Sequence, residues 1–179
     1  LSSDIKLEIS TIEDFDVSVI ECDNLHMFNF AAESHVDRSF IYPKAFSENN
    51  YLATQAMLDK LIAQKLKFRF LHISTDEVYG ESNQIGFSET SPFAPTNPYS
   101  ASKAAADILI QTYIKCFDLN AKIVRPNNVY GHRQHVEKLI PKLFHCLQED
   151  KEFFLHNGGK MKRSFLHTDD LSEALLSIV

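Results

Sequence analysis

The sequence predicts an α/β protein in which short buried strands alternate with helices in a parallel sheet. Three apolar runs bounded by polar residues are typical of buried strands: Leu25 to Phe30, Phe68 to Ile73 and Ala121 to Val124. Between the first two, apolar residues recur with helical spacing from Phe46 to Gln64. A strand–helix–strand unit of this length implies a right-handed crossover and therefore a parallel sheet.

Composition narrows the classes of function. The 179 residues, 44% of them hydrophobic, are enough for one core, and length alone favours one domain. A net charge of −6 argues against a general nucleic-acid surface, and no run of Lys and Arg opposes this. The sequence has no signal-peptide pattern and no apolar run of membrane-spanning length. Cys22, Cys116 and Cys146 form no C-x-x-C pair, so we expect a soluble, reduced and cytoplasmic protein.

The sequence predicts the role of some segments before the second strand less definitely than that of others. Asp14 to Glu21 is expected to be an acidic surface helix or loop. The small residues of Ala31-Ala32-Glu33-Ser34 follow the first strand. They are compatible with a flat ligand close to the backbone or with a tight turn, and the sequence favours neither. Asn49 and Asn50, in the first half of the following helix, are expected to be solvated or capping residues unless a ligand lies nearby.

Prolines and glycines delimit the elements after the second strand. Pro92, Pro95 and Pro98 exclude regular structure before a helix that runs from Tyr99 to Phe117. After the third strand, polar residues of Arg125 to Gly131 lie where ligands of open α/β sheets bind.

The last third of the chain is predicted to mix one longer helix with short elements. A helix is expected from Leu139 to Leu147, with a proline tolerated in its first turn. Phe153 to His156 and Arg163 to His167 are predicted to be short strands flanking a turn at Asn157-Gly158-Gly159. Thr168 is the expected N-cap of a terminal helix from Asp169 to Val179.

The best candidates for chemistry follow the second strand. Thr75, Asp76 and Glu77 stand at its carboxyl end, where two adjacent carboxylates that differ in burial can reach different pKa values. One of them could then act as an acid and the other as a base. Tyr99 and Lys103 lie four residues apart on one helix face, so the ammonium is expected to lower the pKa of the phenol.

Three other kinds of site have weaker support. The histidine pairs His132 with His135 and His156 with His167 lack the spacing of a metal site, so we expect no metal. No G-x-S-x-G sequence supports a serine hydrolase. The five glycines form neither G-x-G-x-x-G nor a P-loop.

These residues belong to a wider set of motifs that runs through most of the chain. The motifs are FNFAAESHVDRSF at 28–40, STDEVYG at 74–80, PTNPYSASKAAAD at 95–107, NNVYG at 127–131, EKLIPKL at 137–143 and KRSFLHTDD at 162–170. Together they resemble the nucleotide-sugar 4,6-dehydratases of the extended short-chain dehydrogenase/reductase superfamily, and most closely the members that act on dTDP-glucose. The Tyr-x-x-x-Lys pair is typical of the whole superfamily, whereas Thr75-Asp76-Glu77 indicates the dehydratases.

The resemblance implies an NAD-dependent dehydration of an NDP-glucose, expected to be dTDP-glucose, to the 4-keto-6-deoxy sugar. Tyr99 would be the base for the C4 hydroxyl, with Lys103 lowering its pKa and binding ribose. Thr75 would bind the same hydroxyl. Asp76 would protonate the departing C6 hydroxyl, and Glu77 would remove the proton from C5.

The resemblance also assigns binding residues. Those expected to contact NAD are Glu8, Ile9, Phe30, Ala31, Ala32, Glu33, Ser34, Asn49, Tyr99, Lys103 and Val129. Those expected to contact the nucleotide sugar are Ser34, Thr75, Asn128, Lys138, Leu139, Phe154, Leu155, His156 and Arg163. The cations Lys138 and Arg163 suit a diphosphate.

The implied fold is a Rossmann-like parallel sheet with flanking helices that lacks the family's N-terminal Gly-rich βα unit. Residues 1–136 would form a partial NAD-binding domain, and 137–179 the start of a smaller substrate lobe. We therefore expect a fragment of a longer protein that forms a homodimer when complete. The alternatives are an inactive fragment that serves as a binding module, or a nucleotide-sugar epimerase or decarboxylase, which Asp76-Glu77 disfavours.

Overall fold

The computed structural model describes residues 7–12, 14–20, 24–81, 86–160 and 162–179. The chain divides into two compact units, Leu1–Val124 and Arg125–Val179. This division follows backbone contacts, whereas the expected lobe boundary at residue 137 concerns ligand binding and stays a prediction. Among the described residues, no helix combines the length and the apolar character needed to cross a membrane.

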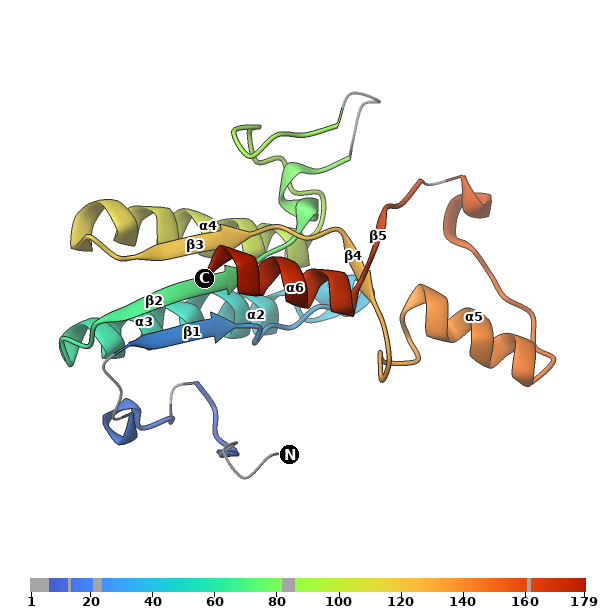
Figure 1. The fold of residues 1–179 in the computed structure, drawn as a ribbon. Helices are drawn as coiled ribbons and strands as arrows, with labels where there is room; N and C mark the ends of the chain where they lie inside the picture. Colours follow the sequence, from blue (N-terminus) through green and yellow to red (C-terminus); the bar gives the residue numbers. More distant parts are fainter. Residues whose placement is uncertain (1–6, 13, 21–23, 82–85, 161) are drawn as a thin grey trace. The chain divides into compact units, whose positions relative to one another are not determined.

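A three-stranded parallel sheet forms the centre of the first unit (Figure 1). Its strands β1 (Leu25–Asn29), β2 (Phe68–Ile73) and β3 (Ala121–Val124) lie in the order β1-β2-β3. The pairing ends with Ile73 beside Val124, so polar residues that follow β2 emerge at the carboxyl edge of the sheet. The three predicted strands and the parallel arrangement are confirmed.

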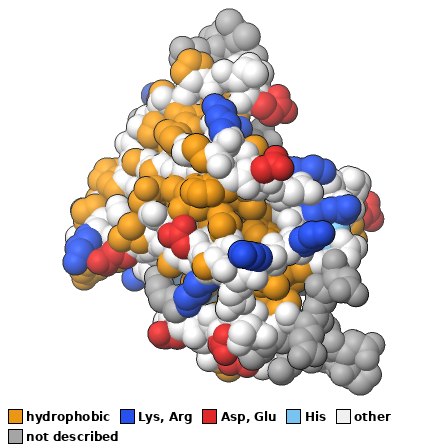
Figure 2. All heavy atoms as spheres, turned by 90° about the vertical axis from the view of Figure 1, so that its left-hand side faces the viewer, with side chains coloured by type: hydrophobic (Ala, Val, Ile, Leu, Met, Phe, Trp, Pro, Cys, Tyr) orange, Lys and Arg blue, Asp and Glu red, His pale blue; other side chains and the backbone are white. Residues whose placement is uncertain are grey.

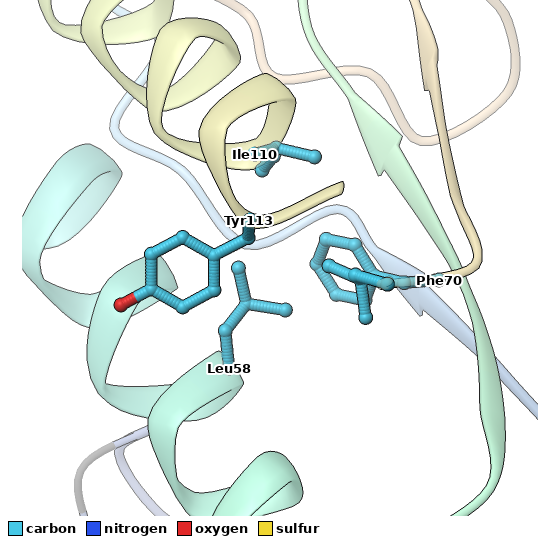
Figure 3. Close-up of a cluster of buried hydrophobic side chains, with 5 residues drawn as sticks. Leu58, Phe70, Ile110 and Tyr113 are labelled. Carbon is cyan, nitrogen blue, oxygen red and sulfur yellow. The ribbon is translucent and has the colours of Figure 1, made fainter. Parts of the chain in front are cut away.

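The described part of the first unit also contains seven helical segments. They are η1 (Val17–Val19), α1 (Val36–Ile41), α2 (Pro43–Phe46), η2 (Ser47–Leu52), α3 (Ala53–Ala63), η3 (Asp76–Tyr79) and α4 (Pro98–Phe117). Of these, α3 and α4 pack against the sheet. Leu58 of α3, Phe70 of β2, and Ile110 and Tyr113 of α4 point toward one another in the buried core (Figure 3). Burial of apolar side chains of this size contributes about 1.5–3 kcal/mol each. This packing holds α3 and α4 against β2, the strand that leads into the candidate site.

The segment Pro43–Ala63 is helical throughout, but it is not a regular α-helix. Its α2 and α3 portions are joined by η2, a π-helical stretch. Such stretches are rare and concentrate at functional sites. Here the wider turn contains Asn49, which is exposed, and Asn50, which is fully buried. The prediction of a solvated or capping role is therefore wrong for Asn50.

Helix α4 begins at Pro98, one residue before the predicted start at Tyr99. Asn97 precedes its first residue, Pro98, and accepts a hydrogen bond from the Ser100 backbone at 2.8 Å. The Ser100 hydroxyl accepts in return from the Asn97 backbone N–H at 3.3 Å, which completes a capping box. A proline at the first helical position needs no hydrogen-bond partner for its nitrogen. Tyr99 is thereby fixed in the first turn of the helix.

The second unit contains a two-stranded parallel sheet and two longer helices. Its elements are β4 (Asn128–Tyr130), α5 (Leu139–Gln148), η4 (His156–Gly159), β5 (Phe165–His167) and α6 (Thr168–Ile178). Strand β5 pairs with β4, with Phe165 opposite Asn128. Gly131 follows β4, and a Cβ atom there would clash with the side chain of Thr168, so only glycine fits.

Two local predictions in this unit are wrong. No strand forms at Phe153–His156: β5 pairs with β4 instead, and Phe154 is 76% exposed. The glycines there form η4, with Gly158 and Gly159 at positive φ. The N-cap of α6 is His167, whose Nδ1 accepts from the Asp169 backbone, and Thr168 is already helical.

Charged side chains are interspersed with apolar ones on the surface. Figure 2 shows one face on which Lys, Arg, Asp and Glu side chains are scattered around a central area of hydrophobic ones. Several large apolar side chains in the described residues are strongly exposed, among them Phe144 at 60% and Leu147 at 68% on α5.

Candidate active site

The candidate site begins directly after β2. The Ser74 backbone N–H donates to the Val124 carbonyl at 2.7 Å, which extends the sheet by one residue. Thr75 then turns the chain and caps η3, since its hydroxyl oxygen accepts from the Glu77 backbone N–H at 3.3 Å. Its hydroxyl also lies 3.4 Å from the Asp76 carboxylate. One turn of 3₁₀ helix thus places Thr75, Asp76 and Glu77 side by side, as predicted.

Glu77 is held by the start of α4. The Asn97 side-chain amide donates from Nδ2 to the Glu77 Oε2 atom at 3.2 Å, while its Oδ1 caps the helix. One asparagine therefore ties the carboxylate of η3 to the helix that carries Tyr99 and Lys103.

Gly80 allows η3 to end against the loop that precedes α4. Its φ of +82° is in the region that favours glycine, and a Cβ atom would clash with the Ala94 carbonyl oxygen. The Ala94 backbone N–H donates to the Val78 carbonyl at 3.0 Å. These contacts fix the end of η3 relative to the loop.

Tyr99 lies beside this cluster in a buried position. Its ring packs edge-on against Phe46, with ring centroids 6.3 Å apart, and its hydroxyl is hydrogen-bonded to the Thr75 side chain. Burial raises the pKa of Tyr99 to about 12; the Thr75 hydrogen bond opposes this shift, and the charges of Glu77, Asp76 and Asp107 add to it. The prediction that this pKa is lowered is therefore wrong for the protein without a ligand, because burial and three carboxylates dominate.

Lys103 is almost fully buried beneath the site. The residue is 1% exposed, and Nζ donates to the Ile73 carbonyl at 2.8 Å. Burial lowers the pKa of Lys103 to about 8, and the charge of Asp107 opposes this shift. The structure thus brings the five predicted catalytic residues together around the end of β2.

The loop after β1 is tied to α4 by one buried side chain. Asn50 accepts from the Glu33 backbone N–H at 2.7 Å and donates to the Glu33 carbonyl at 3.0 Å. Its Nδ2 also donates to the Ser102 hydroxyl at 2.9 Å. Asn50 therefore sets the path of the Phe30–Ser34 segment relative to the helix of Tyr99 and Lys103.

Most of the segment that Asn50 holds is accessible. Phe30 is 58% exposed, and Ala31, Ala32 and Ser34 are exposed, so backbone and aromatic surface are open to a flat ligand at the end of β1. At the end of β2 the Ser74 hydroxyl is buried and has no hydrogen-bond partner among the described residues. Both features are those of a surface shaped for a ligand.

The remaining predicted binding residues are more dispersed. Asn49 is exposed in η2, and Glu8 and Ile9 are exposed in the irregular segment before η1. The second unit contains Asn128 and Val129 in β4, Lys138 and Leu139 at the start of α5, and Phe154, Leu155 and Arg163 on exposed segments. His156 begins η4, and its side chain lies outside the described part of the chain. Their roles stay predictions.

Sequence reasoning missed the residues that support the site. They are Asn29, Asn50, Thr54, His72, Asn97, Ser102 and Asp107, and all of these except Asn97 are at most 5% exposed. Asn97 is part of the PTNPYSASK motif, so its place before a Pro and a helix could have identified it as a cap. The others are polar residues within apolar strands and helices. Such a residue stands out in the sequence, but the sequence does not show which side chain it contacts. In the described ranges, no group of three His, Cys, Asp or Glu residues could hold a metal ion.

The chain is similar to a known protein family and to individual proteins. The family model described as "NAD dependent epimerase/dehydratase family" matches residues 10–179. A dTDP-D-glucose 4,6-dehydratase from Dictyostelium discoideum is 43% identical over 159 residues, which are 83% of this chain and 36% of that protein.

Two solved structures are similar to the chain. One is dTDP-glucose 4,6-dehydratase from Streptomyces venezuelae with NAD bound, which has a TM-score of 0.81 and 38% identity over 84% of this chain and 47% of that one. The other is a UDP-glucuronic acid 4-epimerase from Bacillus cereus, also with NAD, at a TM-score of 0.86 and 28% identity, covering 94% and 54%. The chain spans about half or less of the length of these relatives.

Proposed function

Because the chain belongs to the NAD-dependent epimerase/dehydratase family, we propose that it contributes the catalytic centre of a nucleotide-sugar 4,6-dehydratase. The proposed reaction converts an NDP-glucose, with dTDP-glucose as the expected substrate, to the 4-keto-6-deoxy sugar. The observation that carries this proposal is the adjacent carboxylate pair of Asp76 and Glu77, held next to Thr75 and Tyr99 at the end of β2.

NAD is the cofactor that suits these residues. The exposed backbone of Phe30–Ala32 can accommodate a flat ring, and the buried Ser74 hydroxyl at the neighbouring strand end needs a polar partner. The residues of the first unit that would hold NAD are Glu8, Ile9, Phe30–Ser34, Asn49, Tyr99 and Lys103. When bound, NAD would supply reversible hydride transfer with the sugar and a positive charge that favours ionised phenols.

The first proton transfer belongs to Thr75 and Tyr99. The hydrogen bond between them places both groups where one sugar hydroxyl, at C4, can contact them. Tyr99 accepts the proton of that hydroxyl, while Thr75 orients it. Lys103 supplies a cation one helical turn from Tyr99 and favours the ionised phenol.

Elimination of water uses the two carboxyl groups. Glu77 takes the proton from C5, and Asp76 in its protonated form donates to the C6 hydroxyl, which leaves as water. The Asn97 hydrogen bond keeps Glu77 in position during this step. Removal of either carboxyl group should therefore block elimination and spare cofactor binding.

A product assay tests the proposal. The full-length protein is incubated with NAD and dTDP-glucose or, in parallel, UDP-glucose, and the sugar products are identified. A 4-keto-6-deoxy sugar is the expected product. A 4-epimer would instead favour an epimerase, the activity of the Bacillus cereus neighbour, whose structure matches over 94% of this chain.

The role of Glu77 is tested by a matched pair of variants. Glu77→Gln should lower the rate of product formation by about 10²-fold or more, because it removes a general base. Glu81→Gln changes an exposed carboxylate four residues later and serves as the control. Equal rates for the two variants would exclude the assignment of Glu77 as the base.

A further inference from the structure

A cluster of five buried polar residues lies behind the catalytic centre. Asn29 of β1, Thr54 of α3, His72 of β2, and Lys103 and Asp107 of α4 are each at most 5% exposed. We refer to these five residues as the polar cluster. Buried polar groups are costly unless they are hydrogen-bonded, so their donors and acceptors must be matched. The reaction described above uses only Lys103 among them.

Hydrogen bonds to the backbone fix the orientation of the Asn29 amide. The Ala31 backbone N–H donates to Asn29 Oδ1 at 3.2 Å, so this atom is the carbonyl oxygen. The amino group Nδ2 then faces the Thr54 hydroxyl at 3.3 Å and His72 Nδ1 at 3.2 Å. Thr54 donates its own proton to the Asn50 carbonyl at 2.9 Å, and it therefore accepts from Asn29.

This orientation decides the tautomer of His72. Its Nδ1 atom faces an amide donor and must accept, so the neutral ring carries its proton on Nε2. The Nε2 atom lies 3.3 Å from Lys103 Nζ and 3.9 Å from Asp107 Oδ1. The second separation is too long for a hydrogen bond. The imidazole thus presents an N–H donor to the lysine nitrogen.

An ammonium group and a neutral amine respond differently to that donor. An ammonium has only N–H groups to offer, so a second donor facing it is unfavourable. A neutral amine has a lone pair and can accept the hydrogen bond. The donor from His72 therefore stabilises the uncharged form of Lys103 relative to the charged form.

We propose that His72, held by Asn29 as the Nε2–H tautomer, is a positioning residue that adjusts the proton affinity of Lys103. This role rests on the proposed function only in that Lys103 acts there through Tyr99. Burial lowers the pKa of Lys103 in the same direction, and Asp107 opposes both effects. In the described part of the chain, the titratable groups that act on Lys103 are His72 of β2, whose Nε2 atom lies 3.3 Å from Nζ, and Asp107 of α4. Asp76 and Glu77 of η3 act on Tyr99.

The first test reads the tautomer directly. The full-length protein is labelled with ¹⁵N-histidine, the His72 signals are assigned with a His72→Gln variant, and the protonation of each ring nitrogen is followed against pH. The expected result is a proton on Nε2 and none on Nδ1 while exposed histidines titrate. A proton on Nδ1, or a doubly protonated ring at neutral pH, would overturn the proposal.

The second test measures the effect on Lys103. In His72→Gln the side-chain oxygen can turn toward Lys103 Nζ and accept from an ammonium, so the pKa of Lys103 should rise by about one unit or more. The pKa is read from the Cε signal of ¹³C-labelled lysine.

A second histidine of the same sheet provides the control. His26 lies in β1, three residues before Asn29, and side chains of a strand alternate between its two faces, so His26 is on the face opposite Asn29. His26→Gln should leave the pKa of Lys103 unchanged. An unchanged pKa in His72→Gln, or an equal rise in His26→Gln, would refute the proposal.

Kinetics separate this proposal from the proposed function. In His72→Gln, the limb of the kcat/KM pH profile that follows Lys103 should move to higher pH by the same amount as the measured pKa. The two NMR measurements need no turnover, so they can succeed even if no 4-keto-6-deoxy sugar is formed. If turnover is observed and the tautomer is Nδ1–H, the dehydratase function stands and the role of His72 is excluded.

Discussion

At the scale of single residues, the candidate site depends on side chains that each serve two elements. Asn97 caps α4 through Oδ1 and holds Glu77 through Nδ2. Thr75 caps η3 and bonds to Tyr99. Each of these side chains therefore both stabilises a helix end and positions a reactive group. A substitution can be chosen that removes one of the two roles and keeps the other.

Asn97→Asp should slow product formation while leaving stability nearly unchanged. An aspartate keeps the cap, because its carboxylate accepts from the Ser100 backbone as the amide oxygen does. It loses the Nδ2 donor and places a second carboxylate beside Glu77. We expect a rate about 10-fold lower, and an unfolding free energy within about 0.5 kcal/mol of the unaltered protein.

Asn97→Ala provides the comparison for this experiment. It removes both the cap and the contact with Glu77, so it should lose about 1 kcal/mol of stability as well as activity. Denaturant unfolding and the product assay are run on both variants. If Asn97→Asp retains the full rate, the contact with Glu77 has no part in the reaction.

The proximity of the proposed catalytic residues could be predicted from sequence because they are consecutive or one helical turn apart. Asp76 and Glu77 are adjacent, and Tyr99 and Lys103 are on one face of α4. Their supporting partners are far away in the chain: Asn50 and Ser102 are 52 residues apart, and Asn29 and His72 are 43 apart. Such pairs depend on tertiary packing, which no local pattern encodes. The direction of the pKa shift of Tyr99 depends on the same packing.

At the scale of elements, regular strands and helices with a clear apolar period were predictable. The bounds of β2 and β3 agree with the apolar runs, and α4 ends at Phe117 as predicted but begins one residue before the predicted Tyr99. The failures are the three-residue strand β4 and the missing strand at Phe153–His156. Elements this short are decided by whether a partner strand lies alongside, and β4 and β5 supply one another with that partner.

The π-helical stretch η2 gives a prediction at this scale. Asn50→Ala removes one buried and two partly buried hydrogen bonds, and it leaves the Ser102 hydroxyl and the Glu33 backbone without this partner. The free energy of unfolding should fall by about 2–4 kcal/mol, since each buried polar group left unsatisfied costs about 1–3 kcal/mol. Chemical denaturation of the protein without ligand measures this loss.

The neighbouring residue supplies the control. Asn49→Ala changes an exposed side chain in the same π-helical stretch, and it should alter stability by no more than about 0.5 kcal/mol. Similar losses for Asn49→Ala and Asn50→Ala would mean that alanine itself destabilises η2. The hydrogen bonds of Asn50 to Glu33 and Ser102 would then contribute little to stability.

At the scale of the whole molecule, two buried titratable groups make stability depend on pH in opposite directions. Lys103 has a pKa of about 8 in the folded protein and 10.5 as its ordinary value, so between these pH values the unfolded chain binds the extra proton. Stability therefore rises with pH across that interval. Tyr99 keeps its proton up to a pKa of about 12 against an ordinary 10.0, so stability falls between those two values.

The contribution of Lys103 can be isolated with Lys103→Met. The unaltered protein should gain about 2 kcal/mol of unfolding free energy between about pH 8 and pH 10, relative to Lys103→Met over the same interval. Urea unfolding at a series of pH values measures the difference. Parallel curves for the two proteins would show that burial does not disfavour the charged lysine.

The fixed ends of the segment from Gly80 to Ala94 have a consequence for how this family can change. Gly80 abuts Ala94, and the Ala94 backbone is hydrogen-bonded to Val78, so the segment starts and finishes at one anchored point beside η3. Lengthening a loop between fixed ends costs little, about 0.6 kcal/mol for each doubling. Insertions and deletions within the segment can therefore accumulate during evolution without displacing Thr75, Asp76 or Glu77.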